Sequence, residues 1–123
     1  IVPYVTAGES NNAVMTYIDC PEEWVEKGNC ILIGGKTMIV TYQEYNFCSN
    51  DSHNLALYLK DKHLNRFVGL YLVTSIKKSL SHKYQWGDSI SYKKIQKDTV
   101  NLPSTITKKP DWKLISEIGG VLQ

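Results

Sequence analysis

Amide and hydroxyl side chains that could bond the edges of nucleic-acid bases gather between residues 43 and 54. Residues 41–46 read as a strand end and a turn, and the run from Ser49 to Asn54 is the most polar in the chain. Asn and Gln can bond adenine bidentately, and Ser can bond a base or a phosphate. The alternative is an ordinary turn whose side chains cap backbone amides. The candidate contacts in this segment are Gln43, Asn46, Asn50, Ser52 and His53.

The same segment holds the side chains that a cysteine hydrolase would need. Cys48, Asp51 and His53 lie close together in the sequence. A nucleophile and its base are normally brought together by the fold rather than by adjacency, and no known nucleophile motif surrounds Cys48. Catalysis is therefore a distant alternative to base or phosphate contact.

A second group combines cations with aromatic rings. The run Lys83-Tyr84-Gln85-Trp86-Gly87 could grip a phosphate and pack against a sugar. Tyr84 and Trp86 could equally be core residues whose polar tips are bonded. Further along, Tyr92, Lys93, Lys94 and Lys97 extend the basic stretch. The candidate contacts here are Lys83, Tyr84, Gln85, Tyr92, Lys93 and Lys94.

Positive charge is confined to one part of the chain. The net charge is only +2, yet residues 1–59 hold two Lys against seven acids, net −5, and residues 60–109 hold eleven Lys or Arg against three acids, net +8. Lysines on one face displace counterions from DNA phosphates without reading sequence. A Lys-rich solvated surface is the alternative that charge alone leaves open.

A strand-rich body with one long helix must position these residues. Apolar residues from Leu64 to Leu80 recur at i, i+3 and i+4, which predicts a helix with one buried face. A short strand from Val100 to Leu102 is predicted before Pro103, and Asp111 is predicted as the N-cap of a last helix. The other predicted elements are strands at Val2–Thr6, Met15–Ile18, Cys30–Ile33, Met38–Tyr42 and Leu55–Leu59, and a helical turn at Pro21–Trp24.

At 123 residues with 42% hydrophobic content, the chain is predicted to form one domain with its own core. It opens at Ile1 without an initiator Met, so we expect a piece of a longer chain. No apolar run reaches the roughly 18 residues of a membrane span, and no signal-peptide pattern is present.

The three cysteines lack the paired C-x-x-C spacing of zinc sites. We expect reduced thiols in a cytoplasmic protein and no metal site. In an oxidising compartment Cys20 could pair with Cys30, although Cys30, beside an apolar run, is more simply a core residue.

Two blocks, taken with their order and spacing, resemble a known family. The first contains Gly34-Gly35-Lys36-Thr37, then Thr41-Tyr42-Gln43, then the polar run 47–55. The second contains the residues 83–87 described above, the stretch from Ile95 to Pro103, and Pro110-Asp111-Trp112. The chain resembles the target-recognition domain of the specificity subunit of type I restriction-modification systems, or the equivalent domain of related bipartite type II systems.

The resemblance implies an α+β fold, with a curved mixed β-sheet and one long packed helix. Residues 1–110 would be the target-recognition domain, and residues 111–123 the start of a linking or spacer helix, which Gly119-Gly120 would weaken. Gly34-Gly35 would form a tight turn that presents Lys36 and Thr37 to DNA. A nucleotide-binding phosphate loop is excluded, because the glycine that it needs at position 30 is Cys30.

The resemblance also implies a function without catalysis. Such a domain reads one half of a bipartite site in double-stranded DNA and positions separate DNA methyltransferase subunits and, where present, a restriction subunit. S-adenosylmethionine, ATP and Mg²⁺ would belong to those partners, so no cofactor is expected on this chain. The alternative from another class is an accessory domain that binds a partner protein, or single-stranded RNA through its aromatic residues.

Overall fold

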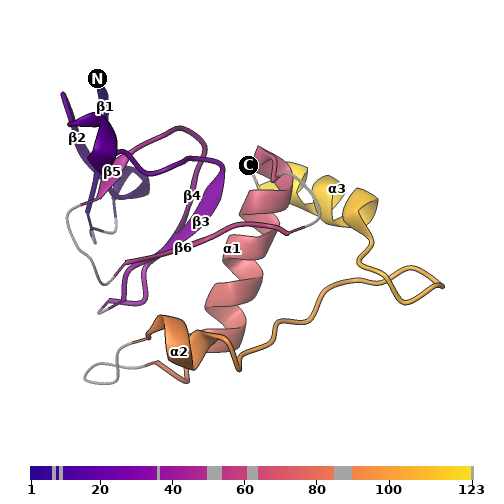
Figure 1. The fold of residues 1–123 in the computed structure, drawn as a ribbon. Coiled ribbons are helices and arrows are strands. Elements are labelled where there is room, and N and C mark those ends of the chain that lie inside the picture. The colour runs from indigo at the N-terminus through magenta and orange to yellow at the C-terminus, as the bar shows by residue number, and fades with distance from the viewer. Residues whose placement is uncertain are drawn as a thin grey trace.

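A computed structural model describes residues 1–6, 8, 10–35, 37–49, 54–60, 64–84 and 90–122 (Figure 1). Most strands and helices lie where the sequence predicts them. The strands are β1 (Val2–Val5), β2 (Val14–Ile18), β3 (Cys30–Ile33), β4 (Val40–Gln43), β5 (Cys48–Ser49) and β6 (Leu55–Leu57). The helices are α1 (Arg66–Leu80), α2 (Tyr92–Ile95) and α3 (Trp112–Leu122), with 3₁₀ turns η1 (Asn11–Ala13) and η2 (Glu22–Trp24).

The described strands form two three-stranded sheets. One is mixed, in the order β2-β1-β5, because β1 pairs antiparallel with β2 and parallel with β5. The other, in the order β4-β3-β6, is antiparallel throughout. The predicted α+β class is confirmed. The finer expectation of a single curved sheet with one long helix is not, since there are two sheets and α3 packs beside α1.

Strand β3 is the centre of the domain because both of its faces are buried. Ile31 and Ile33 pack toward α1, whereas Cys30 and Leu32 pack with residues of the other sheet, including Val5. Alternate strand residues point to opposite faces, so an uninterrupted apolar run suits a strand covered on both sides. The layers are therefore the mixed sheet, the antiparallel sheet, α1 and then α3, as Figure 1 shows.

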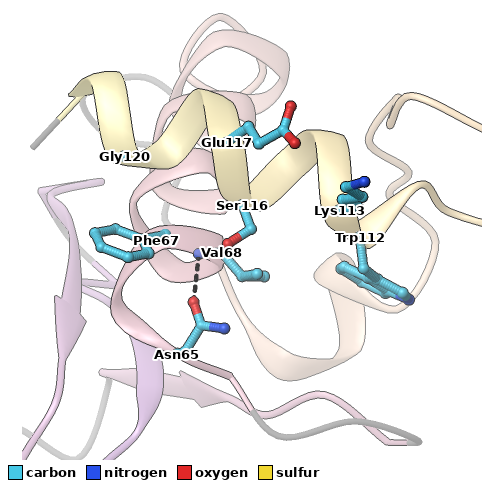
Figure 2. A pocket seen from close by; sticks show the side chains of 8 residues that line it. All are labelled: Asn65, Phe67, Val68, Trp112, Lys113, Ser116, Glu117 and Gly120. Atoms are coloured by element: carbon cyan, nitrogen blue, oxygen red, sulfur yellow. Dashed lines mark hydrogen bonds between the residues drawn. The ribbon is translucent and has the colours of Figure 1, made fainter.

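Helix α1 begins at Arg66 rather than at Leu64 because Asn65 is its N-cap. The Asn65 Oδ1 accepts a hydrogen bond from the Val68 backbone N–H at 2.9 Å, which satisfies one of the free amides of the first turn (Figure 2). Behind the cap, an apolar face that includes Val68 and Leu72 is buried against the antiparallel sheet. The predicted helix is confirmed.

Helix α3 has the predicted N-cap and continues past its two glycines. Asp111 Oδ1 accepts from the Leu114 N–H at 3.1 Å, which confirms the cap. Helix α3 runs through Gly119-Gly120 to Leu122, so the two glycines, which were expected to weaken it, do not end it. Gly119 is buried where α3 crosses α1, and a Cβ at this position would lie 1.8 Å from the Phe67 carbonyl oxygen. The glycine therefore allows the two backbones to approach closely.

The predicted strand from Val100 to Leu102 is not formed. Both apolar residues are partly buried against the main core, but no strand pairs with them. The apolar residues at 100 and 102 therefore indicate burial and not strand pairing, because a side chain can pack on the core without a hydrogen-bonded partner strand. The connection from Pro103 to Pro110 is closed by a bridge between Ser104 and Pro110.

Candidate nucleic-acid interface

The turn between β3 and β4 meets the segment that precedes α2. Gly34 N–H donates to the Ile39 carbonyl and Met38 N–H to the Gly34 carbonyl, both at 2.9 Å, so the predicted tight turn is confirmed. The Gly35 carbonyl accepts from the N–H of Ile90, a buried residue, at 3.1 Å. Two segments that are far apart in the sequence, each predicted to contact phosphates, are therefore joined at one end of the domain.

Helix α2 presents lysines beside this junction. The Ser91 side chain caps the helix by accepting from the Lys94 N–H at 3.2 Å, and Lys93 and Lys94 are exposed. A hollow of about 360 Å³, here called the lysine hollow, separates these side chains from the segment that follows α1. The lysine hollow is lined by Lys83, Tyr84, Lys93, Lys94 and Lys97. Four lysines line this one concave surface, and a concentration of positive charge suits a phosphate-bearing ligand.

An acid lies beside the lysine hollow. The Asp98 carboxylate accepts hydrogen bonds from Lys83 Nζ and from the Tyr84 hydroxyl. Burial alone would raise the pKa of this carboxyl, but the two hydrogen bonds and the charge of Lys83 outweigh burial and lower it. Asp98 is therefore ionised at neutral pH, and it neutralises one of the surrounding lysines.

The predicted contacts that lie at this end of the domain differ in exposure. Thr37, in the β3–β4 turn, is exposed, and so is Tyr92, which is 70% accessible at the start of α2. Lys83 is exposed but paired with Asp98. Tyr84 is buried and its hydroxyl is hydrogen-bonded, as in the alternative that made this ring a core residue. It therefore forms part of the lining of the lysine hollow.

Gln43 lies in the strand end of residues 41–46 rather than in the turn, and its side chain is buried instead of open to a base. It is the last residue of β4 and is 3% exposed. Its Nε2 donates to the Asn12 carbonyl and to Thr41 Oγ1, both at 2.9 Å. Pairing of Gln43 with Cys30 in the antiparallel ladder extends the strand through a residue whose neighbours suggest a turn. Its amide nitrogen is therefore committed to holding η1 against β4.

Asn46 is exposed, but it lies near the end of the β3–β4 hairpin that is opposite the turn. Its Oδ1 accepts from the Gly28 N–H at 2.9 Å, near the end of the hairpin where Cys30 pairs with Gln43. The β3–β4 turn is at the other end of that hairpin, three residues along at about 3.3 Å each, or roughly 10 Å away. The structure therefore separates Asn46 and Gln43 from the lysines.

A family model described as the type I restriction modification DNA specificity domain matches residues 1–121 of the 123. The chain belongs to this family. The resemblance to a target-recognition domain of a specificity subunit is confirmed, and membership implies sequence-specific DNA recognition within a restriction-modification system. No match to a curated protein, and none to a solved structure, was found.

Several predicted contacts of this specificity domain lie outside the described residues. They are Lys36, Asn50, Ser52, His53 and Gln85. Their roles remain predictions, and so does any pairing of Cys48 with His53. None of the helices that the structure describes is long and apolar enough to cross a membrane.

The fold places Cys20 beside Cys48 and not beside Cys30, its suggested disulfide partner. The sulfur of Cys20 lies 2.7 Å from that of Cys48, rather than beside Cys30, and all three cysteines are free thiols. The hydrogen bond with Cys48 and burial raise the pKa of the Cys20 thiol to about 11. Cys30 is fully buried in the core, as predicted.

Sequence reasoning missed Asp98 and the bond between Gly35 and Ile90. Asp98 follows Lys93, Lys94 and Lys97 in the sequence, and an acid at this position could have suggested an ion pair with a nearby lysine. No local pattern identifies Lys83 as the partner of Asp98, since the two are 15 residues apart.

We expect Gln43→Ala to act on stability and not on base choice. Losing the amide leaves the Asn12 carbonyl without its donor, so the free energy of unfolding should fall by about 1–3 kcal/mol. Urea unfolding measures this, with Gln96→Ala, at an exposed glutamine, as the control within about 0.5 kcal/mol of the parent. A folded, fully stable Gln43→Ala variant with altered sequence preference would restore Gln43 as a base-reading residue.

Proposed function

We propose that this specificity domain reads one half of a bipartite site in double-stranded DNA and catalyses nothing itself. It would position DNA methyltransferase subunits and, where the system has one, a restriction subunit. Residues 1–110 would form the recognition domain and residues 111–123 the start of the linking helix. S-adenosylmethionine, ATP and Mg²⁺ would be bound by the partners.

The observation that carries this proposal is the hydrogen bond between Ile90 and Gly35. It joins the β3–β4 turn, in which Thr37 is exposed, to the segment just before α2, so that two separately predicted phosphate-contacting segments share one end of the domain. Contacts to phosphates set the position of a protein on a duplex, and side chains in neighbouring turns can then reach base edges.

The spatial distribution of charge supports the same face. Three of the acids described in the first 49 residues, Asp19, Glu22 and Glu23, follow strand β2 of the mixed sheet. Figure 1 shows that sheet at the opposite end of the domain from α2. A duplex would be attracted to the α2 end and repelled from the other, which orients the domain before any base is read.

The residues divide into two roles in this proposal. Lys36, Lys83, Lys93 and Lys94 bind phosphates, and Thr37 and Tyr92 contact the sugar-phosphate backbone beside them. Base reading falls to the polar run after β5, through Asn50, Ser52 and His53, and to Gln85, which follows Tyr84 in the sequence. We no longer include Gln43, because its amide nitrogen is used inside the fold.

A competition experiment tests the proposal against the RNA alternative. The intact specificity subunit, assembled with its methyltransferase, is bound to a labelled duplex selected from a random pool. We expect an unlabelled selected duplex to compete well and single-stranded RNA of equal length to compete poorly. We also expect affinity to fall steeply with salt, by about 0.9 in log K per phosphate contact for each tenfold rise in salt concentration. Equal competition by RNA, or binding that ignores salt, would overturn the proposal.

A further inference from the structure

Asp98 is an acid directly behind the surface that is proposed to bind DNA. Its side chain is 4% exposed, whereas that of Lys83 is 56% exposed. Both carboxylate oxygens are used, Oδ1 by Lys83 Nζ and Oδ2 by the Tyr84 hydroxyl. Asp98 is thus shielded from a ligand in the lysine hollow, and its direct partners line that hollow.

The carboxylate connects two segments that carry the lysines. Lys83 and Tyr84 lie in the turn just after α1, where both backbone N–H groups donate to the Leu80 carbonyl. Asp98 lies in the turn just after α2, where its N–H donates to the Ile95 carbonyl at 3.0 Å. Lys83 therefore stands on one side of the lysine hollow and the α2 lysines on the other, and Asp98 ties the two sides together.

Charge and geometry make opposite predictions for this residue. A negative charge beside a phosphate-binding surface lowers the local positive potential, so charge alone predicts that Asp98 weakens DNA binding. Its hydrogen bonds, in contrast, fix the Lys83 side chain and the spacing across the lysine hollow. Preordering a long cation lowers the entropy lost when it binds a phosphate.

We propose that Asp98 is a positioning residue for DNA binding: it contacts no phosphate, but it holds Lys83, Tyr84 and the α2 turn so that the lysines face one phosphate path. This rests on the proposed function of the lysine hollow. Binding then depends on Asp98 although its charge opposes the ligand.

Asp98→Asn tests the proposal, because the two views differ in the sign of the effect. The intact subunit with its methyltransferase is bound to a selected duplex over a range of salt concentrations. We expect Asp98→Asn to weaken binding roughly fivefold near physiological salt, the value of about one phosphate contact, and to flatten the salt slope by about 0.9. A purely electrostatic role gives tighter binding and a steeper slope. A purely structural role lowers the melting temperature and leaves the affinity of the folded protein unchanged.

Tyr84→Phe provides a second variant that keeps every charge and the buried ring. It removes only the hydroxyl that donates to Asp98, so binding should weaken by roughly two- to threefold, a fraction of one phosphate contact. If Asp98→Asn does not fold, this variant decides. Unchanged or tighter binding by either folded variant overturns the positioning role.

Lys83→Ala separates this inference from the proposed function. In the Lys83→Ala background the positioned cation is gone, so adding Asp98→Asn should weaken binding less than Asp98→Asn does alone: only the tie through Tyr84 remains to be lost, and removal of a negative charge offsets part of that loss. A further loss in the double variant, equal to the loss in the single variant, overturns the inference. If Lys93→Ala/Lys94→Ala leaves binding intact, the proposed interface itself fails, whatever Asp98 does.

Discussion

Replacing Lys93 and Lys94 together by alanine should weaken DNA binding about 30-fold near 0.15 M salt, equally on preferred and unrelated duplexes. Each phosphate contact contributes about 0.9 to the slope of log K against log salt concentration, so losing two should flatten that slope by about 1.8. Both side chains are exposed on α2 beside the lysine hollow and should add little to stability. Binding of the intact subunit with its methyltransferase, titrated at several salt concentrations, measures both quantities.

The matched control removes the same charge elsewhere. Lys27 precedes β3 and Lys113 is on α3, and both are exposed away from the lysine hollow. Lys27→Ala/Lys113→Ala lowers the net charge by the same two units, so a long-range effect of charge would weaken binding as much as the test variant does. We expect only a small loss, since exposed charges beyond about 8–10 Å are screened at this salt concentration. Equal losses in the two double variants would contradict a local phosphate site on α2.

Local signals were sufficient for most of the secondary structure. The apolar run at β3, the helical period of α1 and the cap at Asp111 each depend on a few neighbouring residues. Such patterns predict the folded structure well because the residues that are periodically apolar in the sequence are the ones that the core buries. Where the pattern reported burial alone, as at Val100 to Leu102, the sequence could not tell a strand from an extended segment packed on the core.

The candidate interface depended on contacts that no local pattern encodes. The β3–β4 turn and the segment before α2 meet at a hydrogen bond between Gly35 and Ile90, which are far apart in the sequence. Gln43 has the residue type of a base reader, yet pairing with β3 places it inside the fold. The lysines were visible in the sequence as a basic stretch, but the pairing of Lys83 with Asp98 was not. Residue type therefore predicted the chemistry of the candidate DNA-binding surface. Tertiary contacts determine which of its side chains are still free to contact DNA.

The glycines of α3 show the same division between local and tertiary effects. By helix propensity, Gly119 and Gly120 are equally unfavourable, each by about 1 kcal/mol relative to alanine. In the fold they differ completely: a Cβ at Gly119 meets the Phe67 backbone, whereas a Cβ at Gly120 has no atom within 4 Å. Figure 2 shows Gly120 at the edge of the groove between α1 and α3.

Gly119→Ala should therefore lower the free energy of unfolding by about 3 kcal/mol or more, at the upper end of the cost of overpacking. The obstacle is the backbone carbonyl of α1, which lies 1.8 Å from the added carbon, and α3 can relieve the clash only by moving away from the helix that it covers. Gly120→Ala should instead leave stability unchanged or raise it by up to about 1 kcal/mol, because it only restricts the unfolded chain. Urea unfolding of the two variants beside the parent measures the difference. Similar unfolding free energies for the two alanine variants would mean that α3 does not cross α1 at Gly119.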